Sequence, residues 1–161
     1  MSKLLHLGCY SHQEFDDLCE TNGWNDECCP EEVAFISIIG TQECQDYYIE
    51  EKEFHWFKQP HPNVLNLEFD DISEDVITWE GHNFYGLSME DGKRIVDFIM
   101  GNLGKPFYIH CRAGRSRSQG IVRFILDTFP EYHYTVRSDN PPETPNIDVL
   151  CKLKRIYRCF L

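Results

Sequence analysis

One short stretch of the chain gathers the residue types that nucleophilic attack on phosphorus requires. It reads His110-Cys111-Arg112-Ala113-Gly114-Arg115-Ser116-Arg117-Ser118. A short apolar run ends at Ile109 and a helical pattern begins at Ser118, so the stretch is predicted to be a strand-to-helix loop. Glycine and small residues let such a loop curl tightly. Its amide groups, together with the positive end of the following helix, would then form a cradle for an oxyanion.

Two side chains of this loop could act on an anion held in the cradle. Cys111 would lie at its base, where a positive field lowers the pKa of a thiol and favours the nucleophilic thiolate. Arg117 stands six residues later, and its planar guanidinium can grip two oxygens of a phosphoryl group. The plain alternative is an inert buried cysteine in an ordinary turn. Three arginines within six residues are poorly suited to a core turn.

The stretch resembles the His-Cys-x5-Arg-Ser/Thr signature of the protein-tyrosine phosphatase superfamily and matches every fixed position. The resemblance is firm over residues 105–129 and looser over residues 33–155. It implies a phosphatase that uses a phosphocysteine intermediate, releases inorganic phosphate and needs no metal or cofactor. The expected substrate is phosphotyrosine in a protein or peptide, and the small size favours the dual-specificity branch, which also takes phosphoserine and phosphothreonine. The implied substrate-binding residues are Arg112, Ala113, Gly114, Arg115, Ser116 and Arg117.

Expulsion of an alkoxide or phenoxide from phosphorus needs a proton donor. In this superfamily the donor is an aspartate on a loop upstream of the cysteine. Here two carboxylates follow the predicted strand Val64–Phe69, and the resemblance favours Asp71, with Asp70 in reserve and Asp75 third. The alternative is that at least one of them is a solvated turn residue.

The resemblance assigns supporting roles to three further residues. The Ser118 hydroxyl would stabilise the thiolate as the intermediate breaks down, and His110 would orient the loop by hydrogen bonding. Asn146 begins the last predicted helix and would support the site region.

Arg112 and Arg115 leave the substrate class open. Two basic residues occupy the matching loop positions in the branch that acts on phosphoinositides, where they could bind further phosphates. They could instead contact local acidic groups such as Asp70 and Glu68. The alternatives are therefore phosphoinositides or inositol phosphates, and RNA 5′-phosphates. A phosphate-binding pseudoenzyme would lack the nucleophile, the arginine or the acid, and a rhodanese-like sulfurtransferase would not need Asp71.

The hydrophobic pattern predicts the elements that position this loop. Strands are expected at 4–7, 33–39, 64–69 and 105–109, and helices at 11–19, 42–49, 88–103, 118–129 and 146–160. Ser11 and Glu14 form a capping-box pattern. The alternation predicts an α/β fold, with one domain over residues 1–161 and a central, mainly parallel sheet flanked by helices. The resemblance implies that this is a protein-tyrosine phosphatase-like fold.

Composition limits the functions further. The 161 residues are 42% hydrophobic and carry a net charge of -12, which disfavours nucleic-acid binding. Residues 1–110 hold six basic and twenty-two acidic side chains, whereas residues 111–161 hold nine basic and five acidic ones. Such a concentration of arginine in an acidic chain predicts a local anion site.

Targeting and cysteine patterns are unremarkable. The longest apolar run, Val33–Ile39, is too short for a membrane span, and no secretory signal is evident, so a cytoplasmic location is expected. The eight cysteines are expected to be reduced thiols, and none of them shows the Cys-x-x-Cys spacing that structural zinc sites favour.

Overall fold

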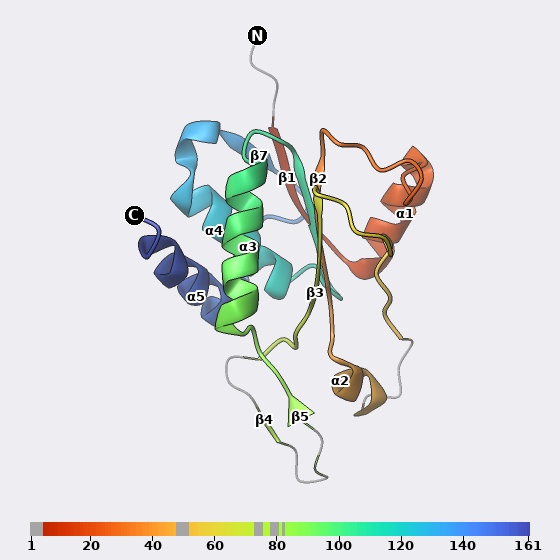
Figure 1. Cartoon of the computed structure of the whole chain (residues 1–161), viewed down its shortest axis with the longest axis vertical. Helices are drawn as coiled ribbons and strands as arrows, with labels where there is room; N and C mark the ends of the chain where they lie inside the picture. Colours follow the sequence, from red (N-terminus) through yellow and green to blue (C-terminus); the bar gives the residue numbers. More distant parts are fainter. Residues whose placement is uncertain (1–4, 48–51, 73–75, 78–80, 82) are drawn as a thin grey trace.

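The computed structural model describes residues 5–47, 52–72, 76–77, 81 and 83–161. Figure 1 shows a central sheet with helices on both of its faces. The elements follow in the order β1 (Leu5–Tyr10), α1 (His12–Asn22), β2 (Ala34–Ile39), α2 (Gln42–Tyr47), β3 (Val64–Glu68), β4 (Val76–Ile77), β5 (Asn83–Phe84), α3 (Met89–Asn102), β6 (Phe107–His110), α4 (Arg117–Thr128), the short 3-10 helix η1 (Pro130–Tyr132), β7 (Tyr134–Val136) and α5 (Ile147–Arg158).

The main sheet has the strand order β3-β2-β6-β1-β7, and every pairing in it is parallel. Helix α1 lies on one face, and α3, α4 and α5 lie on the other (Figure 1). The predicted α/β fold with a parallel sheet between helices is confirmed. Because all strands run the same way, their carboxyl ends meet at one edge, where such sheets bind ligands. Strand β6 is the middle strand, so the loop that follows His110 lies near the centre of this edge.

Strand β2 shows how the sheet separates two cores. All six of its residues are buried, as in a strand covered on both faces. Ile36 and Ile38 belong to the large core cluster that includes residues of α3, α4 and α5. Phe35 points to the opposite face and packs edge-on against Phe15 of α1, with the ring centroids 6.0 Å apart. The alternation of side chains along a strand therefore places one set of residues under α1 and the other under the three remaining helices.

Two of the helices that start near the ligand-binding edge, α1 and α5, are capped by side chains. The capping box predicted at Ser11 is present: Ser11 Oγ accepts from the Glu14 amide at 3.0 Å, and Glu14 Oε1 accepts from the Ser11 amide at 2.9 Å. Asn146 caps α5 in the same way, since its Oδ1 accepts from the Val149 amide at 3.1 Å. These caps fix where the chain enters α1 and α5, beside the loop after β6.

Some predicted boundaries differ from the structure. Strand β7 (Tyr134–Val136) occupies part of a segment expected to be a loop, and helix α4 begins at Arg117, one residue earlier than expected. The short antiparallel pair β4–β5 lies in a stretch expected to be irregular. Residues 4, 48 and 49, which belonged to predicted elements, lie outside the described residues.

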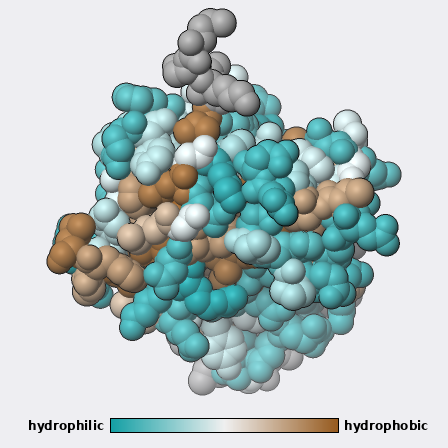
Figure 2. Space-filling view, turned by 45° about the horizontal axis from the view of Figure 1, so that its top comes forward, coloured by the Kyte–Doolittle hydropathy of each residue, from teal (hydrophilic) through white to brown (hydrophobic). Residues whose placement is uncertain are grey.

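The surface is largely hydrophilic. Figure 2 shows hydrophobic side chains gathered mainly at the left, the side on which α3, α4 and α5 lie in Figure 1. Exposed large apolar residues of α3, of α5 and of the C-terminal end include Met89, Ile147, Phe160 and Leu161. None of the described helices combines the length and the apolar character that a bilayer span requires.

Candidate active site

The loop between β6 and α4 is tightly curled and depends on one glycine. Gly114 has φ +70°, in the left-handed region that suits glycine. A Cβ atom there would lie 2.6 Å from the carbonyl carbon of Tyr10 and 2.8 Å from the Ser11 nitrogen. Only a residue without a side chain therefore lets the loop approach the β1–α1 connection this closely.

The carbonyl groups of the loop are bound by the surrounding protein. Arg112 O accepts from the His12 amide at 3.0 Å, and Ser116 O accepts from the Asn146 amide at 3.0 Å. Gly114 O accepts from the side-chain amides of Asn140 at 2.9 Å and Gln119 at 3.2 Å. The N–H and C=O of one peptide group point in opposite directions. Because these carbonyl groups point outward to their donors, the amide N–H groups of the residues that follow them point toward the inside of the loop.

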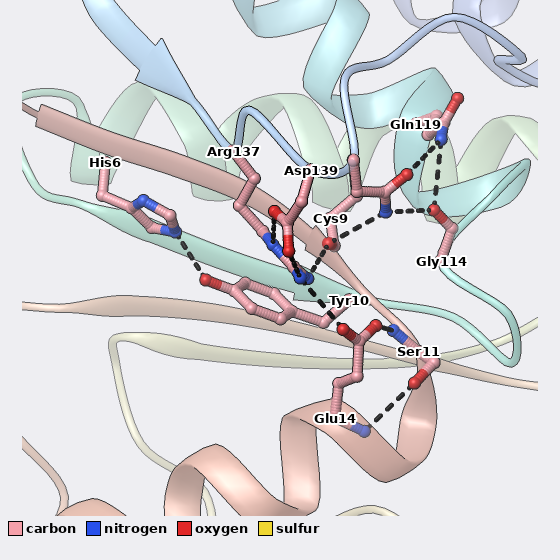
Figure 3. A network of polar contacts seen from close by, with 10 residues as sticks. His6, Cys9, Tyr10, Ser11, Glu14, Gly114, Gln119, Arg137 and Asp139 are labelled. Carbon is pink, nitrogen blue, oxygen red and sulfur yellow. Dashed lines mark hydrogen bonds and ion pairs between the residues drawn. The ribbon is translucent and has the colours of Figure 1, made fainter.

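The segment after β7 is hydrogen-bonded to β1, to α1 and to the loop between β6 and α4 (Figure 3). Arg137 donates to Cys9 O at 2.9 Å and to Glu14 Oε2 at 2.9 Å, which ties the segment to β1 and α1. Asn140, three residues later, donates to both Cys9 O and Gly114 O. The sequence patterns did not indicate Arg137, Asn140 or Gln119 as supports of the loop.

The inner amides of the loop have no acceptor in the described part of the protein. This holds for the backbone N–H groups of residues 113–116. The guanidinium of Arg117 is buried, and its Nη1 donates to Phe69 O at 2.8 Å, but its Nε has no partner among the described residues. Buried donors are costly unless they are hydrogen-bonded. The loop therefore presents several donors without an acceptor among the described residues, which suits the binding of an oxyanion.

Cys111 is the first residue of the loop after β6. Its side chain is buried, and its Sγ is 3.1 Å from the hydroxyl oxygen of Ser118 in the first turn of α4. Cys9 on β1 is a second buried thiol in the core, and burial raises its pKa to about 12, so it remains protonated. The structure thus places the thiol of Cys111 beside the hydroxyl of Ser118.

The two adjacent aspartates have different surroundings. Asp71 is exposed, and its Oδ1 accepts from Ser116 Oγ at 2.6 Å and from Asn146 Nδ2 at 2.8 Å. Its Oδ2 has no partner among the described residues. Asp71 therefore lies at the rim of the loop, with one carboxylate oxygen held and the other available.

Asp70, in contrast, is buried and fully engaged with the protein. Its Oδ1 accepts from the Thr41 amide at 2.9 Å, and its Oδ2 accepts from Thr41 Oγ1 at 2.8 Å and the Tyr85 amide at 2.8 Å. These bonds join the segments after β2, β3 and β5, which gives Asp70 a structural role. Asp75 lies outside the described residues.

Arg112 and Arg115 both have exposed side chains. Arg112 Nη1 lies 3.7 Å from Glu53 Oε1. Glu53 is buried, and its Oε2 accepts from the Gly40 amide at 3.1 Å. One of the two alternatives from the sequence was that these arginines contact local acidic groups such as Asp70 and Glu68. In the structure Arg112 lies beside Glu53, which comes from a distant segment.

A cavity of about 270 Å³ lies beside the loop. Both Arg117 and Asp71 contribute to it, so the buried guanidinium and the exposed carboxylate face the same space. Its wall is formed by Gly40, Cys44, Gln45, Glu53, Asp70, Asp71, Ile72, Phe84, Arg112 and Arg117.

Comparisons with known proteins are limited to solved structures, since no family model and no curated protein sequence matches the chain. The chain is similar to PTPMT1 in complex with PI(5)P, with 16% identity, coverage of 81% of this chain and 83% of that chain, and a TM-score of 0.40. Human tyrosine phosphatase-like serine/threonine/tyrosine-interacting protein gives 19% identity, coverage of 89% and 83%, and a TM-score of 0.45. A further structure of PTPMT1 gives 14% identity, coverage of 96% and 94%, and a TM-score of 0.42. The chemistry of the site rests on the residues and distances given above.

Proposed function

We propose that this chain is a cysteine phosphatase of the protein-tyrosine and dual-specificity phosphatase superfamily. One observation carries the proposal. The sulfur of Cys111 lies at the base of a loop whose inner amides and buried Arg117 Nε have no protein acceptor among the described residues. Such a ring binds the three equatorial oxygens of a phosphoryl group and leaves its phosphorus in line with the sulfur.

The first step transfers the phosphoryl group to the protein. The Cys111 thiolate attacks phosphorus, so that an S–P bond forms while the bond to the leaving oxygen breaks. Asp71 donates its proton to that oxygen. The carboxyl is suited to this because Ser116 and Asn146 both bind Oδ1, which leaves Oδ2 to carry the proton.

The second step releases inorganic phosphate. The Asp71 carboxylate takes a proton from water, the water oxygen bonds to phosphorus, and the S–P bond breaks to regenerate the thiolate. Ser118 Oγ, 3.1 Å from the sulfur, donates a hydrogen bond to the thiolate as it forms. His110 and Asn146 support the loop and the acid, as the resemblance implies.

The proposed substrate is a phosphotyrosyl side chain of a protein. The cavity beside Arg117 has an aromatic wall residue, Phe84, and an aliphatic one, Ile72, which suit a phenyl ring. The pairing of Arg112 with Glu53 lowers the positive charge available for a second phosphate, which disfavours inositol phosphates as substrates.

A panel of substrates tests both the proposed phosphatase activity and the proposed preference for phosphotyrosine. Purified protein should hydrolyse p-nitrophenyl phosphate in the presence of EDTA, and a phosphotyrosyl peptide should have a higher kcat/KM than a phosphothreonyl peptide, inositol phosphates or triphosphate-ended RNA. Preference for one of the other substrates would replace the substrate assignment and leave the mechanism in place. Phosphate binding without hydrolysis would indicate a pseudoenzyme. Thiocyanate formation from thiosulfate and cyanide, without phosphatase activity, would indicate a sulfurtransferase.

Substitution of Glu53 should shift the substrate preference. In Glu53→Gln the amide oxygen can still accept from Gly40, while the charge attraction between Arg112 and residue 53 is removed. We expect kcat/KM for an inositol bisphosphate to rise about two- to fivefold relative to a phosphotyrosyl peptide, the size expected for a long ion pair whose arginine is exposed to solvent. Glu68→Gln is the matched control, because Glu68 is exposed and lies outside the cavity wall. An equal change for both substrates would contradict this role of Glu53.

A further inference from the structure

A chain of three side chains connects the half-buried His55 with the backbone of Cys111. Ser37 Oγ lies 2.7 Å from His55 Nδ1 and 2.6 Å from His110 Nε2. His110 Nδ1 in turn lies 3.2 Å from the carbonyl oxygen of Cys111. Ser37 on β2 and His110 on β6 are register partners in the parallel sheet, so their side chains leave the same face.

The chemistry of these groups sets the direction of each hydrogen bond. A carbonyl oxygen can only accept, so His110 Nδ1 carries a proton. Burial, above all, lowers the pKa of His110 to about 3, so the ring is neutral at neutral pH and its Nε2 accepts. Ser37 must therefore donate its single proton to His110, and its oxygen accepts from His55 Nδ1–H. All three bonds donate toward Cys111.

The end of this chain acts on the phosphate loop itself. A donor fixed on Cys111 O holds the peptide between residues 111 and 112, so the N–H on its other side is directed into the loop. The His110 ring is confined by aromatic neighbours, with centroids 4.4 Å away at Phe15 and 5.2 Å away at His12. The hydroxyl of Ser37 is the hydrogen-bond partner of His110 Nε2 and sets the rotation of this ring.

We propose that Ser37 and His55 are positioning residues for the reaction, acting through His110 on the orientation of the Cys111 peptide. This inference rests on the proposed function. Neither residue belongs to the loop motif, and neither touches the cavity beside Arg117. Their contribution is to keep the first amide of the loop aimed at the phosphoryl group, through donors aligned toward the carbonyl oxygen of Cys111.

The test combines steady-state kinetics with alkylation of Cys111 by iodoacetate, an anion that fits the loop. Ser37→Ala removes the middle of the chain. We expect its kcat/KM for p-nitrophenyl phosphate to fall roughly tenfold, and its alkylation rate to fall by a similar factor at acidic pH. At alkaline pH the alkylation rates of the two proteins should converge. Ser37→Thr keeps the hydroxyl and should restore the wild-type profile.

The charged and titratable groups that face His110 are His12 of α1, His55 and Arg117 of α4, and all of them are retained in the serine variants. His55→Phe removes the first donor and should shift the alkylation profile in the same direction as Ser37→Ala, but less. Ser88→Ala is the control, since Ser88 only caps α3. It should lower the melting temperature and leave the alkylation profile unchanged.

The outcomes separate this inference from the proposed function. A Ser37→Ala protein that melts earlier but alkylates like wild type would overturn the positioning role. If Ser37→Ala does not fold, an unchanged profile in His55→Phe would overturn it equally. If wild-type protein hydrolyses no phosphomonoester and its Cys111 reacts no faster than the exposed Cys28, the proposed function itself fails.

Discussion

Replacement of Cys111 by serine should abolish phosphatase turnover while the protein still binds phosphate. The hydroxyl of serine is a far weaker nucleophile than a thiolate, so no phosphoenzyme forms. We expect kcat for p-nitrophenyl phosphate to fall by roughly 10⁴-fold or more. The amides of residues 113–116 and the Arg117 guanidinium are unchanged by the substitution, so inorganic phosphate should still raise the melting temperature.

Cys44 supplies the matched control for this experiment. It lines the same cavity, and burial is the largest cause that raises its pKa to about 12, so it is a protonated thiol near the site. Cys44→Ser should retain turnover, and mass spectrometry of rapidly quenched wild-type protein should place the phosphoryl group on Cys111. Turnover that survives in Cys111→Ser and disappears in Cys44→Ser would transfer the nucleophile to Cys44.

Local sequence was sufficient to predict the loop because all of its parts lie within nine consecutive residues. The sulfur, the required glycine, the guanidinium and the start of α4 are adjacent in the chain, and a strand and a helix determine where the loop begins and ends. The parallel sheet was predictable for a similar reason, since strands alternate with helices along the chain.

The supports of the loop could not be predicted, because they come from distant segments. Whether Ser37 meets His110 depends on the register of β2 against β6, which no local pattern specifies. Glu53 reaches Arg112 from a segment without regular structure, although other carboxylates lie nearer to the loop in sequence. Strand β7 was missed because it has three residues, none of them fully buried, at the edge of the sheet.

The roles of the two aspartates after β3 also could not be distinguished from local sequence. Asp70 and Asp71 are of one residue type and adjacent in sequence, so only their partners distinguish them. The buried Asp70 has three donors, and the exposed Asp71, at the rim of the loop, has one oxygen without a partner among the described residues. This difference supports the earlier preference for Asp71 as the acid, which stays a prediction until turnover is measured.

Substitution of Asp71 by asparagine should slow turnover most for substrates whose leaving group must be protonated as it departs. Phenyl phosphate releases a basic phenoxide, so its kcat/KM, which reports the first step alone, should fall roughly 10²- to 10³-fold. The kcat/KM of p-nitrophenyl phosphate, which has a better leaving group, should stay within about tenfold of wild type.

Asp70→Asn separates this chemical effect from a structural one. It should lower the free energy of unfolding by about 2 kcal/mol, because a buried carboxylate that accepts three hydrogen bonds becomes an amide with one acceptor oxygen. Any loss of activity in this variant should be similar for both leaving groups, since the proton donor is intact. If the dependence on the leaving group appears in Asp70→Asn and is absent from Asp71→Asn, the acid is Asp70, and the hydrogen bonds of Asp71 to Ser116 and Asn146 serve only to brace the loop.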